Sequence, residues 1–184
     1  MRSSVYHDAA EAHAFKEPSF GWYVALRRYL AVVLVGNLVW EFAHMPLYTI
    51  WWTGTWGEIV FAAVHCTGGD VLIALASLTL ALLMAGNDAW PLKRYRAVAA
   101  LTVLFGAAYT AFSEWLNIVV RTAWAYSDMM PVLSAFGFDV GLSPLFQWIV
   151  VPLIGFWWAL RSLSRSREAK AELQAAEVGG ERIV

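Results

Sequence analysis

The most distinctive chemical feature of the sequence is an apolar stretch that carries an amide, a carboxylate and an imidazole. One helical face would hold five of its side chains, because they lie three, four, seven and eleven residues after the first. They are Asn37, Trp40, Glu41, His44 and Tyr48. Ionisable groups in an apolar segment are costly unless they face the protein interior and find partners there. We therefore expect this face to point toward other helices.

Similar groups recur in the other apolar stretches of the chain. They are His65, Asp70, Glu114, Asn117 and Gln147. At a helical rise of about 1.5 Å per residue, His44, His65 and Glu114 fall roughly 10 Å below the same membrane surface, and Asp70 is deeper. Scattered structural groups would not gather at one depth, so the sequence predicts a polar pocket in one half of the membrane, which is the outer half in the orientation predicted below.

The elements that carry these groups are predicted to be transmembrane helices. Hydrophobic residues make up 60% of the chain, charged residues only 15%, and the mean hydropathy is +0.55. These values are typical of multi-pass membrane proteins and not of soluble domains. The apolar runs predict an all-α bundle with four transmembrane spans, at about 26–50, 58–84, 97–120 and 144–160. A net charge of −1 provides no basic field for nucleic acid.

The segments outside the spans complete the predicted organisation. Residues 26–160 form the transmembrane domain, residues 1–25 a cytoplasmic N-terminal segment, and residues 161–184 a charged cytoplasmic tail. The connector at 121–143 is rich in aromatic side chains, and we expect it to form a partly helical amphipathic lid on the outer surface. Ser143, directly before a proline, is typical of the capping residue at a helix start.

Two kinds of backbone signal accompany the predicted pocket. Pro46 and Pro152 have no N–H, so each leaves one carbonyl of its helix without the usual partner. Such carbonyls occur at membrane depth where neighbouring groups or water satisfy them. The Gly68–Gly69 pair, next to Asp70, predicts a close helix approach or a local distortion.

One hypothesis for the pocket is a metal site. Glu41 and His44 present a carboxylate and an imidazole from one helical face, and His65 and Glu114 arrive from two other helices. Mixed nitrogen and oxygen ligands suit zinc, iron or manganese. The Glu-x-x-His spacing is half of the di-iron bundle pattern, and a second copy is missing from the sequence. A haem between His44 and His65 is a less favoured alternative, because nearby carboxylates make that pocket acidic.

A second hypothesis is acid–base catalysis on a lipid-soluble substrate such as a lipid, an isoprenoid or a sterol, by an isomerase, hydrolase or oxidoreductase. The catalytic candidates are Glu41, His44, His65, Asp70, Glu114 and Asn117. Side chains that would contact the ligand are Trp40, Tyr48, Trp115, Tyr126, Gln147 and Trp148. The general plan is similar to that of membrane sterol isomerases of the emopamil-binding type, which have intramembrane His and Glu in a small helical bundle. This resemblance carries over no residue roles.

Non-catalytic alternatives remain beside these hypotheses. Membrane bundles use buried polar side chains as interhelical hydrogen-bonding partners, and the candidates could serve that purpose alone. The chain could also be a membrane subunit or carrier that holds a metal, haem, pigment or lipid. In every case the expected partners are membrane lipids or a lipid-soluble small molecule, and the expected location is the inner (plasma) membrane of the cell.

The distribution of basic residues predicts the orientation of the chain. With the N-terminus in the cytoplasm, all of the 13 Lys and Arg residues except Arg121 lie on the cytoplasmic side, as the positive-inside rule favours. We expect reporter fusions after Trp56 and within 125–140 to read as external, and fusions after Arg94 or at the C-terminus to read as cytoplasmic. A cytoplasmic reading after Trp56 would contradict both the orientation and the outer position of the pocket.

Overall fold

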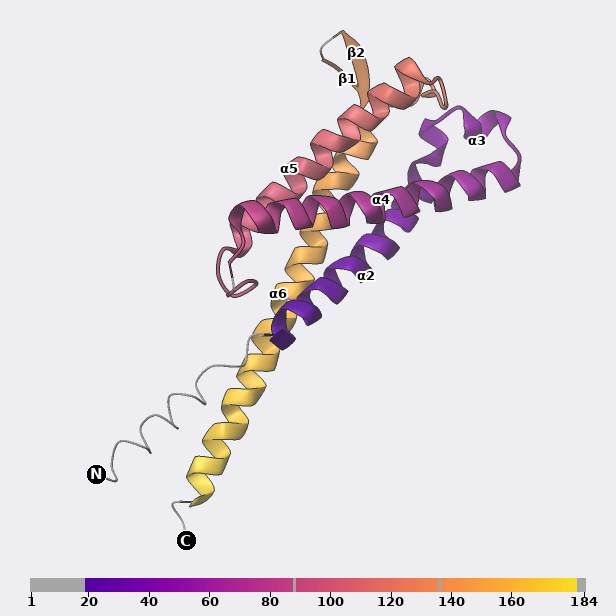
Figure 1. Cartoon of the computed structure of the whole chain (residues 1–184). Coiled ribbons are helices and arrows are strands. Elements are labelled where there is room, and N and C mark those ends of the chain that lie inside the picture. Colours follow the sequence, from indigo (N-terminus) through magenta and orange to yellow (C-terminus); the bar gives the residue numbers. More distant parts are fainter. Residues whose placement is uncertain (1–18, 88, 136, 182–184) are drawn as a thin grey trace.

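The computed structural model describes residues 19–87, 89–135 and 137–181. Its long helices are α2 (Ser19–His44), α4 (Trp56–Ala85), α5 (Tyr95–Glu114) and α6 (Leu142–Glu181) (Figure 1). The shorter elements are the 3-10 helix η1 (Met45–Leu47), the helix α3 (Ile50–Thr53), the π-helix η2 (Trp115–Val120) and the strands β1 (Val132–Ala135) and β2 (Phe138–Gly141). The chain is therefore mostly helical.

Four helical stretches are long and apolar enough to cross a membrane, which indicates an integral membrane protein. They are Gly21–Leu47, Trp56–Ala85, Tyr95–Val120 and Leu142–Arg161. The four predicted spans agree with these stretches to within a few residues at each end. The first helix ends earlier than expected because Pro46, which cannot donate a helical hydrogen bond, lies in η1 directly after α2.

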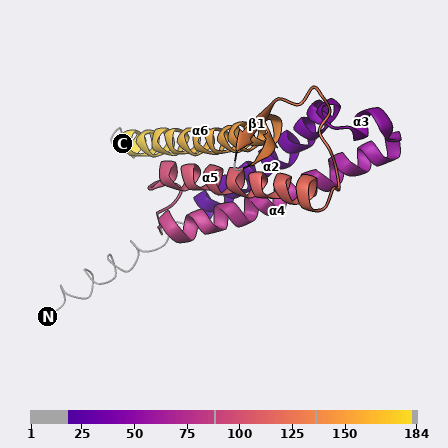
Figure 2. The same cartoon turned by 90° about the horizontal axis from the view of Figure 1, so that it is seen from above.

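The four long helices form one bundle in which each packs against two others. α2 packs against α4 and α6, and α5 packs against the same two helices. Figure 2 shows the bundle from above, where α6 and α4 lie on opposite sides. α6 extends well past the other helices, because it continues from its apolar part through the charged residues that follow Arg161 (Figure 1).

Small residues at the interfaces let these helices approach closely. The alanines Ala25, Ala74 and Ala81 are almost completely buried in the core. The closest approach is at Gly106 of α5, where an added Cβ would lie 2.0 Å from Cε3 of Trp148 in α6. α5 and α6 can therefore meet at this level only because residue 106 has no side chain.

The buried face of α4 is a stripe of small and polar residues. It includes Ala63, Thr67, Asp70, Ala74 and Ser77. Gly68 and Gly69 lie beside this stripe, and a Cβ added to either would meet nothing within 4 Å. The close approach predicted at these glycines is thus wrong, because α4 continues through them as a regular helix and they do not face a neighbour.

The connector between α5 and α6 also differs from the prediction. Its described residues contain no helix after η2 and instead form an antiparallel hairpin, with Val132 paired to Gly141 and Ala135 to Phe138. Gly137, in the turn, has a φ of +83°, which glycine adopts easily. A short run with Val and Phe around such a turn favours strands over a helix. The predicted partly helical segment is therefore a hairpin.

The start of the connector is tied to the segment between α2 and α4. The N–H of Thr49 donates to the carbonyl of Ala125 at 3.0 Å, and the N–H of Ser127 donates to the carbonyl of Leu47 at 2.9 Å. The Ser127 hydroxyl donates to the carbonyl of Pro46 at 3.0 Å. The connector thus lies across the end of α2 that carries the predicted pocket.

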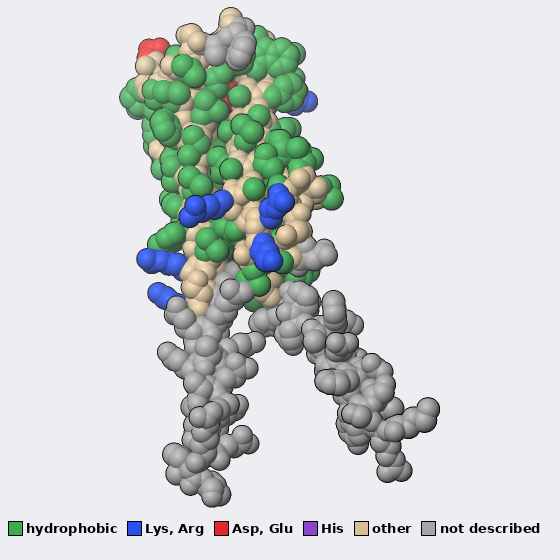
Figure 3. All heavy atoms as spheres, turned by 90° about the vertical axis from the view of Figure 1, so that its left-hand side faces the viewer, with side chains coloured by type: hydrophobic (Ala, Val, Ile, Leu, Met, Phe, Trp, Pro, Cys, Tyr) green, Lys and Arg blue, Asp and Glu red, His purple; other side chains and the backbone are tan. Residues whose placement is uncertain are grey.

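Apolar side chains dominate the face of the bundle that Figure 3 shows. Examples from three helices are Val39, Phe61 and Leu104, each more than half exposed. On the face in Figure 3, Lys and Arg side chains gather toward one end of this apolar surface. An apolar belt with charges at its end is the surface that a membrane-spanning bundle requires.

The close packing at Gly106 predicts a cost for adding one methyl group. We expect Gly106→Ala to lower the free energy of unfolding by about 1–3 kcal/mol, as overpacked cores typically do. Gly68→Ala is the matched control, and the greater helix propensity of Ala should leave it as stable as the wild type or slightly more stable. Thermal unfolding of the detergent-solubilised variants measures the difference. Equal melting temperatures for the two variants would contradict the packing described here.

Candidate functional site

A network of polar side chains occupies the end of the bundle covered by the connector. The predicted face of α2 is buried, with Asn37, Glu41 and His44 each less than 10% exposed. Asp70 of α4 and Gln147 of α6 are also buried and face it. Most of the residues that the sequence singled out therefore meet in the interior.

The amide of Gln147 connects three helices. Its Nε2 lies 3.2 Å from Oδ1 of Asn37, 3.0 Å from Oε1 of Glu41 and 3.0 Å from Oδ2 of Asp70. An amide nitrogen carries two hydrogens, so it cannot give each of the three oxygens a hydrogen of its own. A proton shared between the Glu41 and Asp70 carboxyls would complete the set. The amide nitrogen is thus a common neighbour of three oxygens on two other helices.

His44 joins this cluster to the start of α6. Its Nε2 lies 3.2 Å from Oε2 of Glu41, and its Nδ1 lies 3.1 Å from Oγ of Ser143. The indole N–H of Trp40 donates to the same Oγ at 3.2 Å. The sequence predicted Ser143 as a helix cap, but α6 already begins at Leu142 and the hydroxyl contacts α2 instead. Sequence reasoning missed this contact because its partners are distant in the chain.

A second group of side chains surrounds Glu114, at the end of α5. Its Oε2 accepts hydrogen bonds from the hydroxyl of Tyr48, at 3.4 Å, and from that of Tyr126. The Tyr126 oxygen in turn accepts the N–H of Gly141 at 2.7 Å. Burial raises the pKa of the Tyr126 phenol, and the Glu114 carboxyl adds to that effect, so the phenol stays protonated and donates.

Tyr48 lies between the two groups. Its ring centroid is 5.2 Å from that of His44 and 5.6 Å from that of Tyr126. Directly after Glu114 the helix changes to the π-helix η2, a form that often marks functional sites. The structure thus places an imidazole–carboxylate pair and a phenol–carboxylate pair on either side of one aromatic ring.

Asn117 is buried but turned away from both groups. Its Nδ2 donates to the carbonyl and the hydroxyl of Ser113, at 2.9 and 3.2 Å, and its own carbonyl accepts from Ala123. These contacts join η2 to the residues directly before and after it. The described geometry therefore gives Asn117 contacts with its own segment and none with the residues around His44.

The structure does not bring His65 into the network. Its side chain is exposed and stacks on Phe61, with ring centroids 5.5 Å apart. The predicted metal set of Glu41, His44, His65 and Glu114 is therefore not assembled. Within the three described segments, no group of three or more His, Cys, Asp or Glu side chains is arranged to hold a metal ion. The imidazoles of His44 and His65 likewise do not face each other as a haem pair would require.

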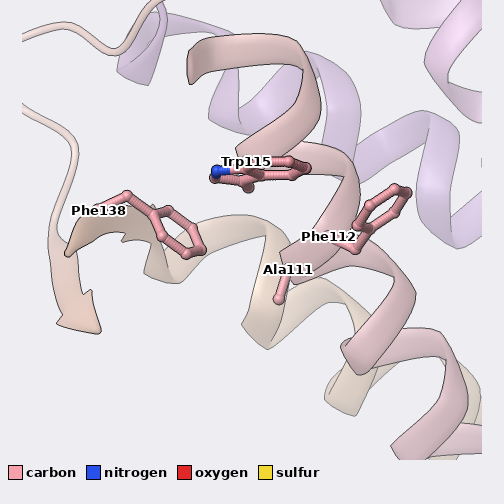
Figure 4. A pocket seen from close by; sticks show the side chains of 4 residues that line it. All are labelled: Ala111, Phe112, Trp115 and Phe138. Carbon is pink, nitrogen blue, oxygen red and sulfur yellow. The ribbon is translucent and has the colours of Figure 1, made fainter. Parts of the chain in front are cut away.

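The aromatic candidates occupy different environments. Trp115 borders a shallow apolar recess of about 280 Å³, together with Ala111, Phe112 and Phe138 (Figure 4). This recess lies between the end of α5 and β2, the elements that also hold Glu114 and the backbone partner of Tyr126. Trp148, in contrast, is completely enclosed in the core beside Asp70.

Comparison with known proteins assigns no family to the chain. No family model matches the sequence, and no curated protein or solved structure shows a significant match. The chemistry of the site is therefore the basis for a functional conclusion.

The Gln147 contacts predict a specific loss of stability. We expect Gln147→Met to lower the free energy of unfolding by about 1–3 kcal/mol, because buried carboxyl oxygens lose their donor. Thr67→Val is the matched control, since that buried hydroxyl donates only to the carbonyl of Ala63 in its own helix, at 2.8 Å. Thermal unfolding in detergent compares the variants. A melting temperature for Gln147→Met at or above that of Thr67→Val would show that the amide does not hold the helices together.

Proposed function

We propose that this protein is a membrane-embedded enzyme in which the Glu41–His44 pair performs acid–base chemistry on a lipid-soluble substrate. The observation that carries the proposal is the environment of the two ring nitrogens of His44. One nitrogen faces the carboxylate of Glu41 and the other faces the hydroxyl of Ser143. An imidazole that is oriented on one side and faces an exchangeable proton on the other is suited to proton transfer.

A second proton-carrying group supports the same reaction type. This group is the Glu114–Tyr126 pair, which is separated from His44 by the ring of Tyr48. Acid–base enzymes commonly place two titratable groups in different environments, so that one donates while the other accepts. The two pairs give this site both roles.

The surroundings of the site favour a substrate that arrives from the bilayer. Trp40 and Ser143 are half-buried, so this edge of the network is reachable, whereas Glu41 and His44 are buried behind it. Val39 and Phe42, on the same helix, are exposed and apolar. A lipid, an isoprenoid or another apolar molecule matches such an approach.

The orientation predicted from the basic residues supports a site within the membrane. With both termini in the cytoplasm, the site lies in the outer half of the bilayer and the connector between α5 and α6 covers it as a lid. We assign the protein to the inner (plasma) membrane on the same basis. A carrier or a non-catalytic subunit is the competing function, and it would bind a lipid without changing it.

The proposal predicts a different outcome for two histidine substitutions. We expect His44→Gln to abolish a change in membrane lipid composition that the wild type produces, because the proton acceptor is lost. His65→Gln is the matched control and should behave as the wild type, since that side chain is exposed and outside the network. Mass spectrometry of lipids extracted from the native host, carrying each form at equal protein level, measures this.

Two results would count against catalysis. Identical lipid profiles for the wild type and His44→Gln would contradict it, and an unaltered lipid that copurifies with the wild type would then favour a carrier. A loss of the lipid change in His65→Gln alone would place the chemistry elsewhere.

A further inference from the structure

We propose that Ser143 is a nucleophile and that the reaction is acyl transfer from the carboxylic ester of a lipid. This inference rests on the proposed function, because it uses the same Glu41–His44 pair as the base. It goes further by naming the bond that forms, the residue that forms it and the class of substrate.

The direction of the hydrogen bonds supports a nucleophilic serine. The Trp40 indole can only donate, so Oγ of Ser143 accepts from it and keeps its own proton available for Nδ1 of His44 in the tautomer that leaves Nδ1 without a hydrogen. With Nδ1 accepting, Nε2 of the neutral ring carries the hydrogen and donates it to Oε2 of Glu41. Each donor thus points along one line, from the hydroxyl through the imidazole to the carboxylate. A hydroxyl next to a base that a third group orients is the arrangement of an activated nucleophile.

The carboxylate at the end of this line is itself fixed. Oε1 of Glu41 lies 3.0 Å from Nε2 of Gln147, which leaves Oε2 for His44. The imidazolium that forms during proton transfer is therefore stabilised by a carboxylate that does not have to reorganise.

The backbone around Ser143 provides a place for the negative charge of the reaction. The first four N–H groups of an α-helix have no partner within it. At the start of α6, the N–H of Gly141 donates to Tyr126, that of Leu142 donates to the carbonyl of Pro131, and Pro144 has none. Among the described residues this leaves the N–H of Ser143 without a partner. A backbone N–H beside the nucleophile, at the positive end of a helix, can stabilise an oxyanion.

The proposed reaction balances in protons and needs no oxidant or reductant. Oγ of Ser143 attacks the ester carbonyl carbon while His44 takes its proton. As the bond between the acyl carbon and the leaving alcohol breaks, His44 gives that proton to the alcohol oxygen. Water then attacks the acyl-serine ester, its proton passes through His44 to Oγ, and a carboxylic acid leaves. A second lipid alcohol in place of water would give transesterification.

The apolar surroundings select lipid esters over soluble ones. Phe146, one turn into α6 from Ser143, is about half exposed, and Phe42 is exposed on α2. The recess bordered by Trp115 and Phe138 offers a further apolar surface between the end of α5 and β2 (Figure 4). An acyl chain has the apolar character that these surfaces match, whereas a charged soluble ester does not.

A fluorophosphonate probe tests this directly, because it forms a covalent bond with an activated serine. We expect the wild-type protein, in isolated membranes, to be labelled, and peptide mass spectrometry to place the label on Ser143. Ser143→Ala should abolish labelling, and His44→Gln should slow it by about 100-fold or more, which is the usual contribution of a general base. Glu41→Gln should slow it less, at an unchanged melting temperature. Ser134→Ala is the control, since that exposed hydroxyl donates to Asp139 and has no imidazole.

The outcomes separate this inference from the proposed function. A wild-type protein that stays unlabelled, or a label on another serine, overturns the nucleophile whatever the variants do. If the His44-dependent lipid change persists in that case, acid–base chemistry stands without a covalent intermediate. If Ser143 is labelled but no lipid changes, the nucleophile stands and the proposed lipid reaction fails. Labelling that is equally fast in His44→Gln and wild type overturns the role of the imidazole.

Discussion

The structure depends on how three carboxyl groups are accommodated inside an apolar bundle. Glu41, Asp70 and Glu114 are all buried, and a buried charge costs several kcal/mol unless it is paired and hydrogen-bonded. Within the described segments, the only salt-bridge contact is that between His44 and Glu41. The other printed contacts of these carboxyls are with neutral donors: the Gln147 amide lies near Glu41 and Asp70, and two tyrosine hydroxyls donate to Oε2 of Glu114. These donors come from different parts of the chain, so satisfying the carboxyls requires the whole bundle.

The hydrogen bonds of the Glu114 carboxyl also determine where the hairpin lies. Tyr126 donates to Glu114 of α5 and accepts from Gly141, directly before α6. Its hydroxyl therefore holds the connector, the end of α5 and the start of α6 in one position. Because the first residues of α6 include Ser143, the hydrogen bonds of Glu114 indirectly fix the hydroxyl that faces His44. The group around Glu114 and the group around His44 are thus coupled through the backbone between Gly141 and Ser143, more than through direct side-chain contacts.

Local periodicity made part of the architecture predictable from the sequence. The polar face of α2 was confirmed, because Asn37, Glu41 and His44 lie within two helical turns and follow one spacing. The structure has four helices that are long and apolar enough to be the predicted spans. His65 was misplaced because its depth was considered and its rotation was not. A residue two positions after Ala63 is turned by roughly 200° on a helix, away from the stripe of small residues that continues at Thr67 and Asp70.

Other features lie beyond local patterns. Ser143 contacts His44 across 99 residues of sequence, and Gln147 contacts Asn37 across 110. Nothing near Ser143 in the sequence distinguishes a helix cap from a residue that faces a histidine. The hairpin was also missed, since its aromatic residues suited an amphipathic helix equally well until the turn at Gly137 was known.

The apolar core beneath Asp70 has an electrical consequence. Past this residue the interior is lined by apolar side chains, including those of Val33, Ala74 and Leu78. The buried hydroxyl of Tyr29 has no hydrogen-bond partner among the described residues. Among the polar groups here, the hydroxyl of Ser77 is also buried on this face of α4, so a charge would find few partners in this layer. This apolar layer therefore raises the cost of placing a charge past Asp70.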